Sequence, residues 1–183
     1  MFSIKEIFKD SIGVLLFASA LSLIAGLFLR NVENDLIIVL PLIIVLPALN
    51  DMIGDFGIIV TSRFTTALYE KKVNNIHSHI VKHLFGEVMP VAIFCAAYIS
   101  VVAILIAHFR GFSFDSSILI KIILITLITT ISLVLFVFLV SIVGGLYVYK
   151  KKMDPDDVLI PITTSIADLL SIGVFSLLVS ILF

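Results

Sequence analysis

Three carboxylates lie inside apolar stretches of this sequence, and their type and spacing could hold a cation. Asp51 and Asp55 are four residues apart in the run 46–57, and Asp168 lies within the last hydrophobic segment. An ionised acid in hydrocarbon is costly, so such residues usually face a cavity, a partner or an ion. These three acids are therefore the first candidates for a functional site.

Asp51 and Asp55 would share one face of a continuous helix, with Asn50 and Gly54 beside them. Oxygen ligands of this kind suit Mg²⁺, Mn²⁺ or Ca²⁺ rather than soft metals. The structural alternative is that Arg63 or hydroxyl groups satisfy the carboxylates, which would then hold helices together. The residue types leave both interpretations open.

Asp168 has a second oxygen-bearing residue, Thr164, one helical turn before it. Asp168 stands about ten residues past the expected helix start near Val158, which at about 1.5 Å per residue is close to the middle of a bilayer. The alternative is a carboxylate that bonds to hydroxyls of a neighbouring helix. Either interpretation places Asp168 inside the membrane.

Two further polar groups of the sequence have simpler explanations than metal binding. His77, His79 and His83 fall with Lys82 in the predicted loop 69–87, where a solvated basic loop is favoured over a transition-metal site. The acidic run 154–157 is expected to cap the last helix, since acids favour a helix N-terminus, although it could also collect cations.

The elements that must position these residues are membrane helices. The chain is 61% hydrophobic and only 14% charged, which excludes an ordinary soluble domain. The net charge of −1 gives no basic footprint for nucleic acid. The sequence predicts one all-α domain over residues 1–183 with five membrane spans of roughly 20 residues or more. The spans are expected at about 11–29, 36–69, 88–109, 116–149 and 158 to the C-terminus.

The second span is too long for a simple crossing, and the sequence offers a cause for a break in it. Pro47 lacks a backbone donor, and Gly54 and Gly57 loosen the helical turns after it. We therefore expect this helix to be broken between Pro47 and Gly57. Irregular backbone inside lipid is tolerated only where protein or a cavity surrounds it.

The basic residues predict the orientation of the chain. Lysines gather before the first span, between the second and third, and between the fourth and fifth. The positive-inside rule then places the N-terminus in the cytoplasm and the C-terminus outside the cell membrane. In the fourth span, Gly144 and Gly145 are expected to allow close helix contact.

Two motifs of the chain resemble a known family. Residues 47–55 with 61–68 resemble the signature second helix of the MgtE magnesium transporter family, closest to the branch with the eukaryotic solute-carrier magnesium transporters. Residues 154–158, 160–161 and 165–169 resemble the last helix of that family. The resemblance covers the whole chain in topology, but only the second and fifth spans in residues.

The resemblance implies a five-helix module that works in pairs around a central cation pore. Asp168 matches the acidic residue that lines this pore at the dimer axis. Asp55 stands where the family usually has Asn in a Gly-Asn step, which is a departure from the pattern. The eukaryotic branch joins two modules in one chain, so a single module implies a homodimer.

The combined prediction is a membrane transporter or channel for divalent cations and not an enzyme. Mg²⁺ is the expected ion, and Mn²⁺ or other divalent cations are the alternatives. The predicted metal ligands are Asp55, Asp168, Asn50, Asp51 and Thr164. One alternative is an intramembrane metal-dependent enzyme. Membrane phosphotransferases with paired aspartates, however, need a second aspartate pair near the first, which this chain lacks. The other alternative is a membrane scaffold that moves no ion.

Overall fold

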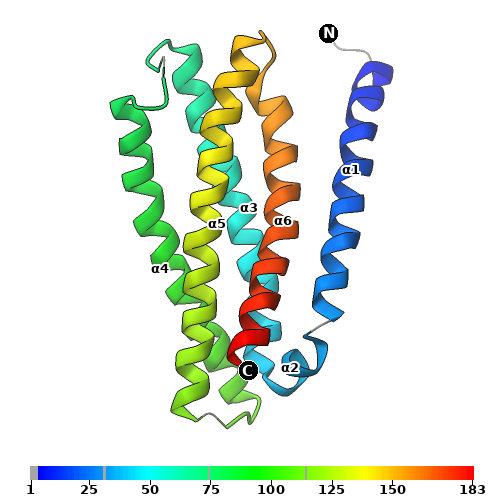
Figure 1. The fold of residues 1–183 in the computed structure, drawn as a ribbon, viewed down its shortest axis with the longest axis vertical. Helices are drawn as coiled ribbons and strands as arrows, with labels where there is room; N and C mark the ends of the chain where they lie inside the picture. Colours follow the sequence, from blue (N-terminus) through cyan, green and yellow to red (C-terminus); the bar gives the residue numbers. More distant parts are fainter. Residues whose placement is uncertain (1–3, 31, 74, 114) are drawn as a thin grey trace.

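The computed structural model describes residues 4–30, 32–73, 75–113 and 115–183, without the side chains of 4–11, 13–15, 17, 18, 35 and 38. This part of the chain is entirely helical apart from its connections, and five of its helices are long (Figure 1). The helices are α1 (Ile4–Arg30), α2 (Glu33–Ile38), α3 (Leu40–Tyr69), α4 (His79–Phe109), α5 (Ser116–Lys150) and α6 (Pro155–Leu182).

The predicted all-α membrane architecture is confirmed. Among the described residues, α3, α4, α5 and α6 are each long and apolar enough to cross a membrane. The first predicted span forms α1, whose described apolar part is Ser19–Arg30. The five long helices therefore correspond to the five predicted spans, with α2 as a short additional helix between the first two.

The predicted break in the second span is wrong in its position. α3 is a single helix from Leu40 to Tyr69 and continues through Pro47. The interruption comes earlier, at Val39, which separates α2 from α3 and has φ −109° and ψ 80°. Pro41 explains this placement, because a proline in the first turn of a helix removes a donor that would have no partner there anyway.

The predicted loop 69–87 is also too long. α4 begins at His79, where the Ser78 hydroxyl accepts a hydrogen bond from the Val81 amide at 3.3 Å. A serine at this position satisfies one of the free amides of the first turn, so the helix starts well before its apolar stretch. His79 and His83 consequently lie on a helix and not in a loop.

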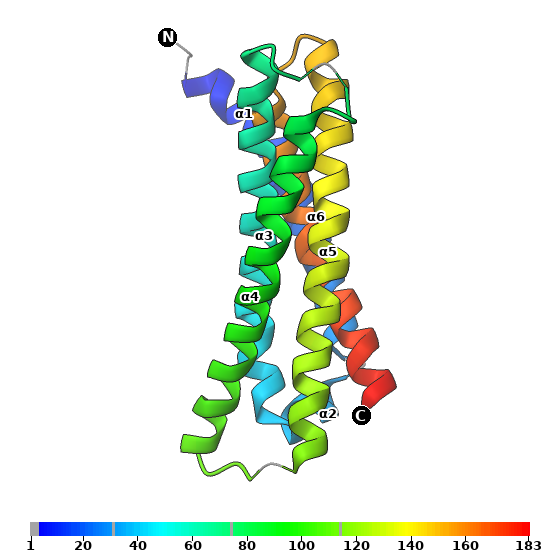
Figure 2. The ribbon, with the colours of Figure 1, turned by 90° about the vertical axis from the view of Figure 1, so that its left-hand side faces the viewer.

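The bundle is organised around α6, which packs against α1, α3 and α5 (Figure 1). α4 lies on the other side and packs against α3 and α5 (Figure 2). α3 and α6 run in opposite directions. The α3–α4 and α5–α6 connections lie at one end of the bundle and the α4–α5 connection at the other (Figure 1).

Glycines allow the helices to approach closely at the end near the α5–α6 connection. A Cβ on Gly144 would lie 2.8 Å from Leu159 Cδ2, and one on Gly145 would lie 2.9 Å from Phe64 Cδ1. Both distances are shorter than side-chain carbons adopt in real structures. The expectation that these two glycines permit close helix contact is therefore confirmed, and the contacts join α5 to α6 and to α3.

Candidate functional site

Asn50 on α3 and Asp168 on α6 meet at the interface of these two helices. The Asn50 amide donates from Nδ2 to Asp168 Oδ1 at 2.8 Å. On the other side of the amide, the Ser171 hydroxyl donates to Asn50 Oδ1. Ser171 is fully buried, and its hydroxyl also lies 3.0 Å from the Asp168 carbonyl oxygen of its own helix. The site thus contains a connected row of three polar side chains.

Asp51 and Asp55 lie on the exposed face of α3. The hydrogen bonds and ion pairs of the described residues include none to either carboxylate. Asp51 directly follows Asn50, the residue that donates to Asp168. The structure therefore brings Asn50, Asp51 and Asp168 together, with Asp55 one helical turn along the same face of α3.

Thr164 lies on α6 one turn from Asp168, as the spacing predicted. Its hydroxyl donates to the Ile160 carbonyl at 2.9 Å and lies 3.1 Å from the Pro161 carbonyl, so its proton is directed at its own helix. Because α3 and α6 are antiparallel, a rise of about 1.5 Å per residue from the Asn50–Asp168 contact puts Asp55 and Thr164 at a similar depth.

Arg63 does not satisfy the acids of α3. Its Nη1 atom lies 3.2 Å from Glu87 Oε2 on α4, and His83 Nδ1 lies 3.4 Å from the other oxygen of the same carboxylate. The structural interpretation in which Arg63 pairs with Asp51 or Asp55 is therefore wrong. The charge of Arg63 is directed toward Glu87 on α4.

The acidic run 154–157 caps the last helix, as predicted, whereas the predicted basic loop is wrong for His79 and His83, which lie on α4. The Asp154 carboxylate accepts a hydrogen bond from the Asp156 amide at 3.0 Å and caps α6, whose first residue is Pro155. Among the described residues, no three His, Cys, Asp or Glu side chains are grouped as a metal site would require.

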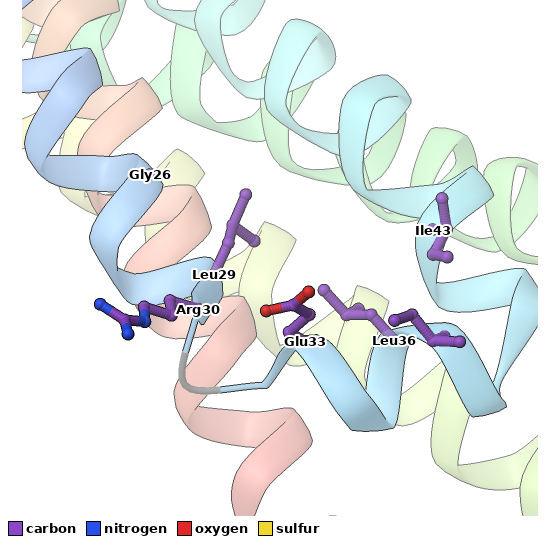
Figure 3. A pocket seen from close by; sticks show the side chains of 7 residues that line it. Gly26, Leu29, Arg30, Glu33, Leu36 and Ile43 are labelled. Carbon is purple, nitrogen blue, oxygen red and sulfur yellow. The ribbon is translucent and has the colours of Figure 1, made fainter.

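Two cavities of the described chain lie away from the acids. One, of about 450 Å³, lies where α1 ends and α2 and α3 begin, and its lining includes Arg30, Glu33 and Leu36 (Figure 3). The Arg30 side chain there points away from Glu33 (Figure 3). The other, of about 560 Å³, lies between α1 and α6. Neither of these two cavities is lined by Asp51, Asp55 or Asp168.

Comparison with known families decides the relationship of the chain. The family model of the MgtE divalent cation transporters matches residues 46–178. The chain belongs to the MgtE family. The match begins before Asn50 and ends after Ser171, so it includes every predicted site residue of this MgtE chain. Searches of curated proteins and of solved structures gave no match.

Membership in the MgtE family has direct consequences for function. The family consists of divalent cation transporters, so this MgtE chain is a multi-pass membrane protein of a transport family and not of an enzyme family. Ser171 is the one member of the polar row that the sequence did not single out. Its signal was its position three residues after Asp168, on the same face of the helix.

Proposed function

We propose that this chain carries Mg²⁺ across the cell membrane through a pore formed by two copies of one five-helix module. The observation that supports this most strongly is the Asp168 carboxylate, held by Asn50 at the α3–α6 interface beside two exposed acids. Mn²⁺ and other hard divalent cations have similar ligand preferences and are possible substrates.

A second copy of the chain explains why the acids are exposed. Asp51 and Asp55 have no protein partner among the described residues, and two unpaired carboxylates facing lipid would be costly. A two-fold axis along the membrane normal would turn the same face of a second α3 and α6 toward them. The dimer then shields the acids from lipid and encloses a path lined by oxygen atoms.

Each predicted ligand has a role in this path. Asp168 from both copies attracts the cation near the middle of the membrane, and Asp51 adds negative charge beside it. Asp55 and Thr164 supply oxygen atoms at the neighbouring depth. Asn50 contributes through its contact with Asp168, since both of its polar atoms already have protein partners.

The basic connections support a cytoplasmic N-terminus. Lys71 and Lys72 in the α3–α4 connection lie at the same end of the bundle as Lys151 and Lys152 in the α5–α6 connection (Figure 1). By the positive-inside rule this end faces the cytoplasm. Since α6 ends at the opposite end, the C-terminus is then outside.

Cation flux into liposomes tests the transport proposal. We expect purified wild-type protein to move Mg²⁺ and Mn²⁺ into vesicles that contain a fluorescent indicator. Asp168→Asn should lower the initial rate by about tenfold or more, because a charged contact contributes on the order of 1.5–3 kcal/mol. Glu87→Gln removes an acid of α4 that contacts Arg63 and His83, and it should leave the rate unchanged.

The alternatives predict different results in the same experiment. A scaffold would show no flux in the wild type, and loss of Asp168 would disturb only assembly. An intramembrane enzyme would show Mg²⁺-dependent turnover of lipid in place of flux. Equal rates for the wild type and Asp168→Asn would contradict the assignment of the site.

Crosslinking tests the dimer separately. In a Cys95→Ser background, Asp55→Cys should form a covalent dimer with a short bifunctional thiol reagent in the membrane. Phe94→Cys provides the control, because Phe94 is exposed on α4 and outside the proposed interface. A dimer that forms equally well through Phe94→Cys would contradict the proposed face.

A further inference from the structure

We propose that Ser171 is a positioning residue that sets the orientation of the Asn50 amide and, through it, of the Asp168 carboxylate. The inference rests on the proposed cation path, to which it adds a residue that does not itself contact the ion. Its basis is the row of hydrogen bonds from Ser171 to Asn50 and from Asn50 to Asp168.

The chemistry of an amide makes its orientation important. One side of the Asn50 side chain is an acceptor and the other is a donor, and a half-turn about the last torsion exchanges them. In the observed orientation Nδ2 donates to Asp168. In the reversed orientation the amide oxygen would face the carboxylate, and two acceptors would repel each other.

The Ser171 hydroxyl is the group that favours the observed orientation. It donates its single proton toward Asn50 Oδ1, although the Asp168 carbonyl of its own helix is an alternative acceptor at 3.0 Å. Ser171 is fully buried, so water does not replace it readily. Without this donor the amide oxygen would lose a partner, and a buried unsatisfied acceptor is costly.

The consequence for the ion concerns one oxygen atom of Asp168. With Oδ1 held by the amide, Oδ2 has no hydrogen bond among the described residues and is available to a cation. A carboxylate held in one rotamer loses less entropy when it binds an ion than a free one does. Ser171 therefore supports cation affinity without being a ligand.

Helix α6 offers a matched control for Ser171. Ser176 is a second buried serine on the same helix, 5% exposed, and its hydroxyl has no hydrogen-bond partner among the described residues. Replacing each serine by alanine removes the same atom from a buried site of α6. Only the Ser171 hydroxyl, however, is connected to Asp168.

The test is the dependence of liposome flux on Mn²⁺ concentration. Ser171→Ala should raise the half-saturating concentration about threefold to tenfold, the effect of one net hydrogen bond, with little change in the maximal rate. Ser176→Ala should leave both unchanged. Ser171→Cys, with a similar size and a weaker donor, should give an intermediate value.

A double variant separates positioning from general stability. In an Asn50→Ala background, Ser171→Ala should have no further effect on the half-saturating concentration, because the amide through which it acts is gone. If the wild type shows flux and Ser171→Ala has the same half-saturating concentration as Ser176→Ala, the positioning role is overturned and the transport proposal stays intact. Absence of flux in the wild type would instead overturn the transport proposal, and the positioning role with it.

Discussion

Glu87 on α4 has two partners, whereas Asp51 and Asp55 on the exposed face of α3 have none among the described residues. Glu87 of α4 contacts both Arg63 and His83, although it lies at an exposed end of the bundle. Asp51 and Asp55 lie deeper in the apolar part of α3, where charge is more costly, and the described residues provide neither with a hydrogen bond or ion pair.

The fold thus provides partners for Glu87, whereas the described residues provide none for Asp51 and Asp55. The α3–α5 contact contains a polar pair and a close packing contact, with the Thr61 hydroxyl donating to Ser141 Oγ at 2.9 Å and Phe64 packed against Gly145. These contacts of α3 with α4 and α5 are made within a single chain. In the proposed pore, an ion and a second copy provide the partners that Asp51 and Asp55 lack among the described residues.

The largest expected effect comes from removing the unpartnered charges. The double variant Asp51→Asn with Asp55→Asn should lower Mg²⁺ flux by more than about tenfold, because the path loses two negative charges in each copy. The protein should also become no less stable, since no ion pair is broken. Flux and thermal unfolding in detergent are the two measurements.

Normal flux in this double variant would show that Asp51 and Asp55 have no part in transport, and would contradict their assignment to the cation path. A lower unfolding temperature would also contradict it, by revealing that the fold depends on these carboxylates. Among the described residues, no Lys or Arg side chain forms an ion pair with Asp51 or Asp55.

The sequence singled out the candidate residues but not their contacts. Asp168 and Asn50 stood out because acids and amides are rare in apolar segments, and helical spacing put Thr164 on one face with Asp168; their role as ligands stays a prediction. The local sequence does not show which helices pack against each other. Neither the contact of Asn50 with Asp168 nor the role proposed for Ser171 could therefore be predicted. A serine in a membrane helix most often bonds to its own backbone, and only the neighbouring helix shows the difference.

The helix boundaries show the same limit. Pro47 and Pro41 carry the same local signal, yet α3 continues through Pro47 and begins beside Pro41. A proline within a helix is tolerated where neighbouring helices support the freed backbone, whereas one in the first turn needs no support. The choice between them depends on packing, which the local sequence does not determine.

A medium effect is expected from Gly145→Ala, at the contact of α5 with α3. The new methyl group would lie 2.9 Å from Cδ1 and 3.0 Å from Cε1 of Phe64, which is 1% exposed, so the ring or the helix must shift to accommodate it. Overpacking of this kind costs about 1–3 kcal/mol. Thermal unfolding in detergent should show a clear decrease for this variant.

Gly173→Ala is the matched control on α6, because a Cβ there would have no neighbour within 4 Å. We expect it to be neutral or slightly stabilising, since alanine favours helix by up to about 1 kcal/mol over glycine. Equal destabilisation by both variants would show that helix contacts at Gly145 are not tighter than those at Gly173.

The smallest effect is expected from Arg63→Ala, which removes the ion pair with Glu87. The two side chains are 63% and 49% exposed, and exposed pairs typically contribute about 0.2–1 kcal/mol or less. Mg²⁺ flux should remain at the wild-type level, because this charge is directed toward α4 and away from the acids. A double-mutant cycle with Glu87→Gln measures the coupling free energy, and a flux assay on the same variants measures transport. A tenfold loss of flux in Arg63→Ala alone would place the arginine in the cation path, and the two sides of α3 would then not be separate in function.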